Sequence, residues 1–158
     1  QAYPKSTFKG YDIAEDAIAS ATLEAGEMGL TNVTFEVQDV TNLPGDVSFD
    51  LITAFDSIHD QVNPQGALNE ASSHLALDGA FMMIDIKASS NLEDNIEHPV
   101  APFFYAVSTL HCMTVSLAEG GAGLGTVWGE QLAVKMLHDA GVNSTSEVEH
   151  RGLPQIRC

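Results

Sequence analysis

The sequence alternates short strand-like runs with stretches of helical periodicity, and this alternation restricts the fold more than any other feature. Residues 7–12 (TFKGYD) read as a strand, and a helical stretch then runs to about Gly29. Its apolar residues recur at helical spacing: Ala14, Ile18, Ala21, Ala25 and Met28. Apolar and polar residues alternate over 33–37, so a second strand follows and closes at Asp39. This order predicts a strand-helix-strand unit with parallel strands.

A second unit repeats the pattern. Residues 49–55 (FDLITAF) form an almost unbroken apolar run, which is typical of a central strand covered on both faces. Asn63 and Pro64 supply a helix cap and a first-turn proline. Leu68, Ala71 and Leu75 make the inward stripe of that helix. Residues 78–79 (DG) predict a turn into a third strand at 81–86 (FMMIDI).

The second half of the chain is less regular. Residues 87–99 are polar and without periodicity, and a long excursion of this kind inside a domain is more often functional than structural. We interpret 87–126 as a substrate-side insertion that includes a lid. The elements expected there and beyond are a buried or capping helix at 103–117, a glycine-rich loop at 119–126, an amphipathic helix at 127–140 and the start of a final strand at 144–150.

The chain is strongly acidic, and this restricts its partners. It has 158 residues, enough for one domain, with 22 acidic and 6 basic side chains and a formal charge of −16. Nucleic acid and anionic membrane surfaces would be repelled, so neither is expected as a partner. The sequence has no run of about 20 apolar residues and no signal-peptide pattern at its start, so a cytoplasmic location is expected. Cys112 and Cys158 are expected to be reduced thiols.

Acidic residues follow the predicted parallel strands, and ligands of open parallel sheets bind beyond the carboxyl ends of the strands. The residues at these ends are Asp12 and Ile13, Asp39 and Val40, residues 55–60, and Asp85. Because a carboxylate offers two acceptor oxygens, Asp12 could hold both hydroxyls of an adenosine ribose. Asp39 could accept a hydrogen bond from the adenine amine while Val40 covers the ring.

Both acids also have structural interpretations. Asp12 with Glu15 three residues later resembles a capping box at the start of a helix. Asp39 could be the first residue of the turn TNLPG that follows it. A cap and a ligand contact can coexist in one residue, so these alternatives stay open at the level of sequence.

Several runs resemble a known family. GYD, FEVQDVTNLP and FDLITAFDSIHDQ resemble the class I S-adenosylmethionine-dependent methyltransferases. FMMIDIKASSNLEDN and PFFYAVSTLHCMTVSLAEGGAGLGTVWGEQ are similar to a subgroup with a winged-helix-like segment before the catalytic domain. The resemblance covers about residues 3–150. It implies a Rossmann-like three-layer α/β/α fold with a mostly parallel sheet, and S-adenosylmethionine as the methyl donor.

The resemblance also implies a set of donor-binding residues. Asp12, with Ile13 beside it, would contact the ribose, and Asp39 with Val40 would contact the adenine. Phe55 and Asp56 would line the methionine side of the pocket. The first strand and the glycine-rich donor loop of the family would precede residue 1, so 1–158 is expected to be an N-terminally truncated, partial domain. Residues 152–158 (GLPQIRC) do not look like the final strand of the family.

His59 is the candidate catalytic residue, because an imidazole with a pKa near 6.5 can take a proton from an acceptor at neutral pH. The alternative is a histidine that only fixes its loop by hydrogen bonding. Asp60, Tyr105 and Trp128 are candidates for acceptor binding, and the two aromatic residues could equally belong to the core. His111 and Cys112 lie in an apolar helix and are expected to be core residues.

Two other motifs are weaker. The pair His59-Asp60 is reminiscent of a phosphohydrolase metal dyad, but the remaining histidines have no suitable spacing, so no metal site is expected. These histidines are His74, His98, His111 and His138. Residues 121–125 mimic a phosphate-binding loop, but no predicted strand leads into them.

The sequence therefore predicts methyl transfer from S-adenosylmethionine to a small-molecule acceptor. A homodimer is compatible with this prediction. Two alternatives remain open at this level, a nicotinamide-dependent oxidoreductase, whose second strand also ends in an acid, and a non-catalytic binding or dimerisation module with the same fold.

Overall fold

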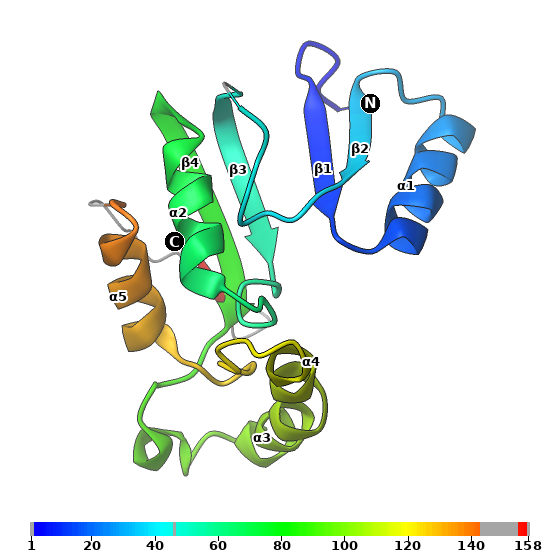
Figure 1. The fold of residues 1–158 in the computed structure, drawn as a ribbon. Coiled ribbons are helices and arrows are strands. Elements are labelled where there is room, and N and C mark those ends of the chain that lie inside the picture. Colours follow the sequence, from blue (N-terminus) through cyan, green and yellow to red (C-terminus); the bar gives the residue numbers. More distant parts are fainter. Residues whose placement is uncertain (1, 46, 143–154, 158) are drawn as a thin grey trace. The chain divides into compact units, whose positions relative to one another are not determined.

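The computed structural model describes residues 2–45, 47–142 and 155–157, and the chain forms two compact units, residues 1–45 and 46–158. The first unit contains β1 (Phe8–Asp12), α1 (Glu15–Glu27) and β2 (Val33–Val37). The two strands are parallel, with Phe8 opposite Val33 and Asp12 opposite Val37, and α1 packs against both (Figure 1). The predicted strand-helix-strand unit is confirmed.

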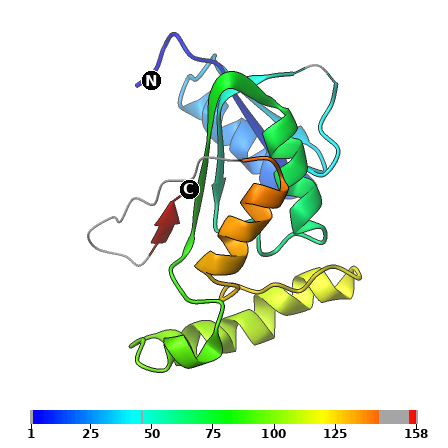
Figure 2. The same ribbon diagram turned by 90° about the vertical axis from the view of Figure 1, so that its left-hand side faces the viewer.

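The second unit contains a three-stranded sheet in the order β3-β4-β5, with β3 and β4 labelled in Figure 1 and β5 drawn in red in Figure 2. β3 (Phe49–Phe55) and β4 (Leu75–Ile86) are parallel, and α2 (Pro64–Ser73) connects them. β5 (Gln155–Arg157) runs antiparallel to β4. The prediction that 152–158 would not supply a strand is therefore wrong, because a three-residue segment has too little pattern to signal a strand. The strand predicted at 144–150 lies outside the described residues.

Two predictions about β3 and β4 are also wrong in detail. α2 ends at Ser73, so Leu75 belongs to β4 and not to the helix stripe. Residues 78–79, which were expected to form a turn, belong to β4. The pairing with β3 is irregular at this point, because Phe49 pairs with Leu75 and Leu51 with Ala80, so that five residues of β4 correspond to two of β3. A sheet irregularity replaces the turn.

β3 is an edge strand of the described sheet and not its centre, because β4 is its one neighbour there. Leu51 and Phe55 are 55% and 56% exposed, so β3 is not buried on both faces in its unit. An apolar run alone did not distinguish an edge strand from a central one, since the same residue types occupy both.

The core of the second unit lies between β4 and two helices, α2 and α5 (Glu130–Asp139). Both helices lie side by side near β4 (Figures 1 and 2). Asn63 accepts a hydrogen bond from the Gly66 backbone and caps α2, as the sequence predicted. The buried cluster consists of Ile58, Leu68, Met83, Trp128, Ala133, Met136 and Leu137.

A long helical segment follows the polar residues 87–99, which include a short 3-10 helix, η1 (Leu92–Asn95). The long helical segment consists of α3 (Ala101–Val107), a π-helical turn η2 (Ser108–Cys112) and α4 (Met113–Ala118). By length and composition alone, this segment could cross a membrane. This is weak evidence for a membrane span, because core helices of soluble proteins can have the same length and composition. It lies at the carboxyl ends of β3 and β4 (Figures 1 and 2).

Candidate functional site

Asp12 and Asp39 lie at the carboxyl ends of neighbouring parallel strands in the first unit. Asp12 is opposite Val37 in the register, and the Gln38 amide donates to the Asp12 carbonyl at 2.9 Å. Asp39 follows Gln38 directly, so both acids lie at the carboxyl ends of the two strands, on the same side of the unit. The sequence predicted this arrangement of the two acids for a site that binds an adenosyl group.

Asp12 stabilises the turn before α1. Its Oδ1 accepts a hydrogen bond from the Ala14 amide at 2.8 Å, and Ala14 is the N-cap residue of α1. The capping-box interpretation is therefore wrong, because Asp12 lies two residues before the cap. Asp12 also lines a hollow of about 260 Å³ against α1, and the adjacent Ile13 is exposed.

Asp39 forms a turn with Thr41. Its Oδ1 accepts from the Thr41 amide at 2.8 Å and from the Thr41 hydroxyl at 2.7 Å. These two hydrogen bonds hold the pKa of Asp39 below its usual value of 3.8, since they favour the carboxylate. The turn interpretation is confirmed, and it keeps Asp39 ionised at the strand end. Val40 beside it is half-buried.

In the second unit, a sharp change of direction after β3 buries His59. Asp56 has a left-handed backbone with φ of 49°, and its amide donates to the Ile84 carbonyl at 2.7 Å. Aspartate tolerates this conformation better than most residues. The chain then turns inward, and Ile58 and His59 are buried while the Asp56 side chain stays exposed.

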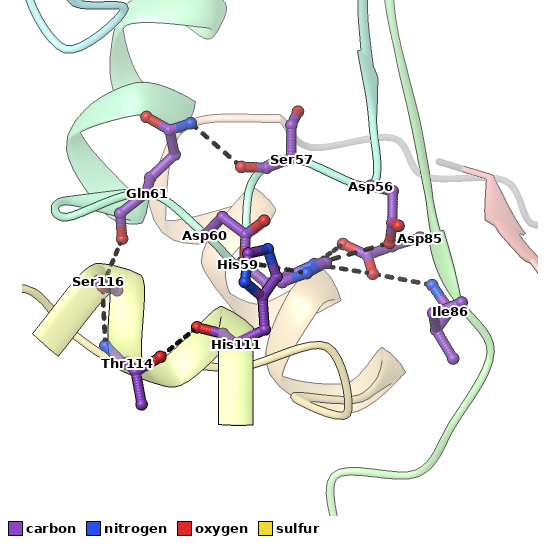
Figure 3. A network of polar contacts seen from close by, with 11 residues as sticks. Asp56, Ser57, His59, Asp60, Gln61, Asp85, Ile86, His111, Thr114 and Ser116 are labelled. Carbon is purple, nitrogen blue, oxygen red and sulfur yellow. Dashed lines mark hydrogen bonds and ion pairs between the residues drawn. The ribbon is translucent and has the colours of Figure 1, made fainter. Parts of the chain in front are cut away.

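His59 and Asp85 form a buried pair at the carboxyl ends of β3 and β4. Nδ1 of His59 lies 3.1 Å from both Oδ1 and Oδ2 of Asp85, and the residues are 1% and 2% exposed (Figure 3). Asp85 also accepts from the Ile86 amide at 2.8 Å. A neutral His59 that donates from Nδ1 to Asp85 keeps a lone pair on Nε2. Nε2 lies 3.4 Å from Oδ1 of Asp60.

The charges around His59 set its protonation. Burial lowers the pKa of His59, but the hydrogen bond and charge of Asp85 raise it, and so do the charges of Asp60 and Asp56. The raising effects prevail, and the pKa lies above its usual 6.5. Desolvation raises the pKa of Asp56, and the charges of Asp85 and Asp60 add to it against the opposing effect of His59. The site therefore favours a positive charge.

The glycine-rich loop supports the His59 segment. The Ser116 hydroxyl of α4 donates to the Gln61 carbonyl at 2.9 Å (Figure 3) and accepts from the Gly123 amide at 3.1 Å. The Ala122 amide donates to the Val62 carbonyl at 3.0 Å. A Cβ on Gly121 would lie 2.5 Å from the Ser116 hydroxyl, so glycine permits this close approach. The loop follows a helix and packs on the His59 segment, which accounts for its glycines without a phosphate.

Cys112 lies beside His59 and Asp60. One ligand atom from each of the three residues falls within 4.8 Å of the others, and Cys112 is 5% exposed. Burial raises the pKa of the Cys112 thiol, and the charge of Asp60 and a hydrogen bond with it raise it further. The backbone amides of Thr126 and Cys112 oppose this shift.

The structure brings some of the predicted acceptor residues together and not others. Asp60 lies next to His59, whereas Trp128 is 4% exposed and belongs to the core cluster. The Tyr105 hydroxyl accepts from Asn95 at 2.9 Å, which links α3 to the 3-10 turn. Phe55, assigned to the donor pocket, is more than half exposed.

Two neighbours of His59 were not predicted as site residues. Asp85 carried a signal, because it is an acid at the end of a predicted parallel strand, but the sequence did not show which side chain it faces. Cys112 carried no signal in its apolar segment. The π-helical turn Ser108–Cys112 shifts the register of the side chains around it, and π turns are frequent at functional sites.

The first residues of the predicted lid are held in place. The Ser90 amide donates to Gln131 at 2.7 Å, and its hydroxyl donates to the Trp128 carbonyl at 2.9 Å. The Glu130 amide donates to the Ala88 carbonyl at 2.9 Å. The segment after β4 is thus anchored at the start of α5, and a lid motion would have to begin beyond residue 90.

A family model covers most of the chain. Residues 1–141 match a family model described as a methyltransferase domain. No curated protein sequence matches the chain with significant similarity.

Several solved structures are similar to the chain. It has 22% identity and a TM-score of 0.66 with the YcgJ protein from Bacillus subtilis, over 91% of this chain and 55% of that protein. It has 17% identity and a TM-score of 0.69 with an O-methyltransferase family protein from Burkholderia thailandensis, over 98% of this chain and 43% of that protein. The chain spans about half the length of these two proteins.

A third similar structure contains a ligand. It is the O-methyltransferase from a trans-AT PKS multienzyme of Brevibacillus brevis in complex with S-adenosyl-L-homocysteine. Identity is 20% and the TM-score 0.50, over 54% of this chain and 29% of that protein. Together the likenesses show a Rossmann-like α/β fold, which confirms the predicted fold class.

Proposed function

The chain belongs to the methyltransferase-domain family, and on this basis we propose that it takes part in methyl transfer from S-adenosylmethionine to a small-molecule acceptor. The observation that carries the proposal is the buried His59–Asp85 pair at the carboxyl ends of two parallel strands, where ligands of such sheets bind. The family match favours this reaction over the nicotinamide-dependent alternative.

The residues at the end of the first two strands suit an adenosyl group. Asp12 and Asp39 lie at the carboxyl ends of their two strands, and one carboxylate oxygen of each accepts a hydrogen bond from a nearby amide. Asp12, with Ile13 beside it, is proposed to contact the ribose and Asp39 with Val40 the adenine. Phe55 and Asp56 are proposed to contact the methionine portion. A bound S-adenosylmethionine supplies an activated methyl group on a cationic sulfur.

His59 is proposed to accept the proton of the acceptor. Asp85 binds the Nδ1 proton, which directs the Nε2 lone pair away from Asp85 and toward the side of Asp60. When an acceptor O–H or N–H donates to Nε2, its oxygen or nitrogen becomes a better nucleophile. The new bond to the methyl carbon replaces the carbon–sulfur bond, and the proton stays on His59. Asp60, beside Nε2, and Tyr105 of α3 are proposed to contact the acceptor, whereas Trp128 lies in the core cluster.

The remaining predictions concern the whole protein. The subgroup with a winged-helix-like segment, the cytoplasmic location and the homodimer all stay predictions. So does the absence of nucleic-acid and membrane partners, for which the formal charge of −16 is the support.

Calorimetry tests the proposed function. S-adenosylmethionine and NAD are each titrated into this chain and into a longer chain that includes the upstream strand and glycine-rich loop implied by the resemblance. Saturable binding of S-adenosylmethionine and none of NAD is expected, at least in the longer chain. Binding of NAD alone would support the oxidoreductase, and binding of neither ligand by either chain would support the non-catalytic module.

A further inference from the structure

His59, Asp60 and Cys112 present three different metal-binding groups to one small volume. The ligand atoms are an imidazole nitrogen, a carboxylate oxygen and a thiol sulfur, and they lie within 4.8 Å of one another. His59 and Cys112 are buried, and the Asp60 side chain is 35% exposed. Ligands held at about 2.0 to 2.3 Å in a tetrahedron around zinc lie roughly 3.5 Å apart. The cluster would therefore need only a small contraction to bind an ion.

Two further observations point to a ligand. Oδ1 of Asp60 is buried without a hydrogen bond of standard geometry among the described residues, and the groups beside it in the cluster are Nε2 of His59, at 3.4 Å, and the Cys112 thiol, a weak donor. An acceptor atom in this state is costly unless a donor or a cation satisfies it. On the other side of the ring, Asp85 fixes His59 through Nδ1. A metal-binding histidine commonly donates its second nitrogen to a carboxylate in this way.

We propose that His59, Asp60 and Cys112 form a three-ligand site for a zinc ion, with Asp85 orienting the imidazole. The mixed nitrogen, oxygen and sulfur set suits zinc, whereas magnesium and calcium take oxygen ligands. The negative charges of Asp56, Asp60 and Asp85 favour a divalent cation. On binding, the Cys112 thiol releases its proton to solvent and the ion takes the Nε2 lone pair.

The zinc site has one consequence for methyl transfer, and this consequence rests on the proposed function. A zinc ion on Nε2 occupies the lone pair that would accept the proton of the acceptor. Zinc should therefore inhibit methyl transfer, and the inhibition should require Cys112. Zinc binding itself is independent of methyl transfer and can be measured without a donor or an acceptor.

Cobalt substitution tests the site directly. Chelator-treated protein is titrated with Co²⁺, and the near-ultraviolet absorption of a thiolate–cobalt bond is recorded before Zn²⁺ is added to displace it. The wild-type chain is expected to bind one ion with a thiolate band. Cys112→Ser should lose the band, and Asp85→Asn should weaken binding by about 10 to 100-fold. Cys158→Ser is the matched control and should behave as wild type.

Asp60→Asn provides a second test of the site that leaves the buried Cys112 unchanged, in case Cys112→Ser does not fold. Asp60 is partly exposed, and far-ultraviolet circular dichroism of each variant reports whether it is folded. Asp60→Asn should weaken cobalt binding at least tenfold and keep its spectrum of secondary structure. No binding by the wild type, or a thiolate band that persists in Cys112→Ser or disappears in Cys158→Ser, would overturn the site. Binding without inhibition of methyl transfer would overturn only the step that depends on the proposed function.

Discussion

Both carboxylate oxygens of Asp85 lie 3.1 Å from Nδ1 of His59, and both side chains are almost completely removed from solvent. A carboxylate at this depth is stable only with hydrogen-bonded or charged partners. The pair therefore links the end of β4 to the segment after β3 and fixes the direction of the imidazole.

The pair predicts a pH dependence of stability. The pKa of His59 is raised above its unfolded value of 6.5, so the folded state binds the proton more tightly. Its contribution is complete below pH 6.5 and is lost as the pH rises through the raised pKa. In metal-free protein, the free energy of unfolding should fall over this range. Asp85→Asn should flatten the fall, and urea unfolding at a series of pH values measures it. An identical pH profile in the variant would contradict the role of Asp85.

Asp12→Ala should weaken the binding of S-adenosylmethionine by about 1 to 3 kcal/mol, if two ribose hydrogen bonds to a charged acceptor are lost. Calorimetry on the chain that binds the donor measures this. Asp16→Ala is the matched control, because Asp16 is an exposed acid in the first turn of α1. Equal affinities of wild type and Asp12→Ala would remove Asp12 from the donor site.

Gly129 precedes α5 with φ of 83°, and a Cβ there would collide with the backbone of Ser90. Gly129→Ala should destabilise the fold by about 2 to 5 kcal/mol, because the backbone strain and the collision add. Gly120 has φ of 74° and open space around it, so Gly120→Ala should cost only about 1 to 2 kcal/mol. Urea unfolding compares the two variants. Equal losses would show that the contact with Ser90 does not matter.

The hydrogen bonds from Thr41 should determine the acidity of Asp39. Carbon-13 NMR of the carboxyl group should give a pKa below 3.8 in the wild type and a higher value in Thr41→Val, which lacks the hydroxyl donor. The stability that this turn contributes is present above pH 3.8 and is lost as the pH falls through the depressed pKa. An unchanged pKa in Thr41→Val would assign the shift to the backbone amide alone.

Much of the fold could be predicted because local patterns and tertiary structure agree. The parallel strands around α1 and the cap at Asn63 follow from periodicity and capping chemistry. The edge position of β3 within the described three-stranded sheet and the antiparallel β5 could not be predicted, since each depends on which strand pairs with which and not on a local pattern. A residue pattern records propensity, and pairing is decided by the whole chain.

The site was only partly predictable for a similar reason. His59 was predicted because it follows a predicted parallel strand and an imidazole can take a proton at neutral pH. Its partners Asp85 and Cys112 come from segments 26 and 53 residues further along the chain. The contact with Cys112 depends on a π-helical turn, which has no sequence signature of its own. The spatial neighbours of a buried imidazole are therefore a property of the folded unit.

The central claim is that Asp85 holds the Nδ1 proton of His59 and leaves Nε2 free to accept another. Nitrogen-15 NMR of the labelled imidazole, in metal-free protein at a pH above the raised pKa of His59, measures this most directly. The wild type should show a proton on Nδ1 and a lone pair on Nε2, and Asp85→Ala should lose this preference. A proton on Nε2 in the wild type, or the same tautomer in the variant, would contradict the claim.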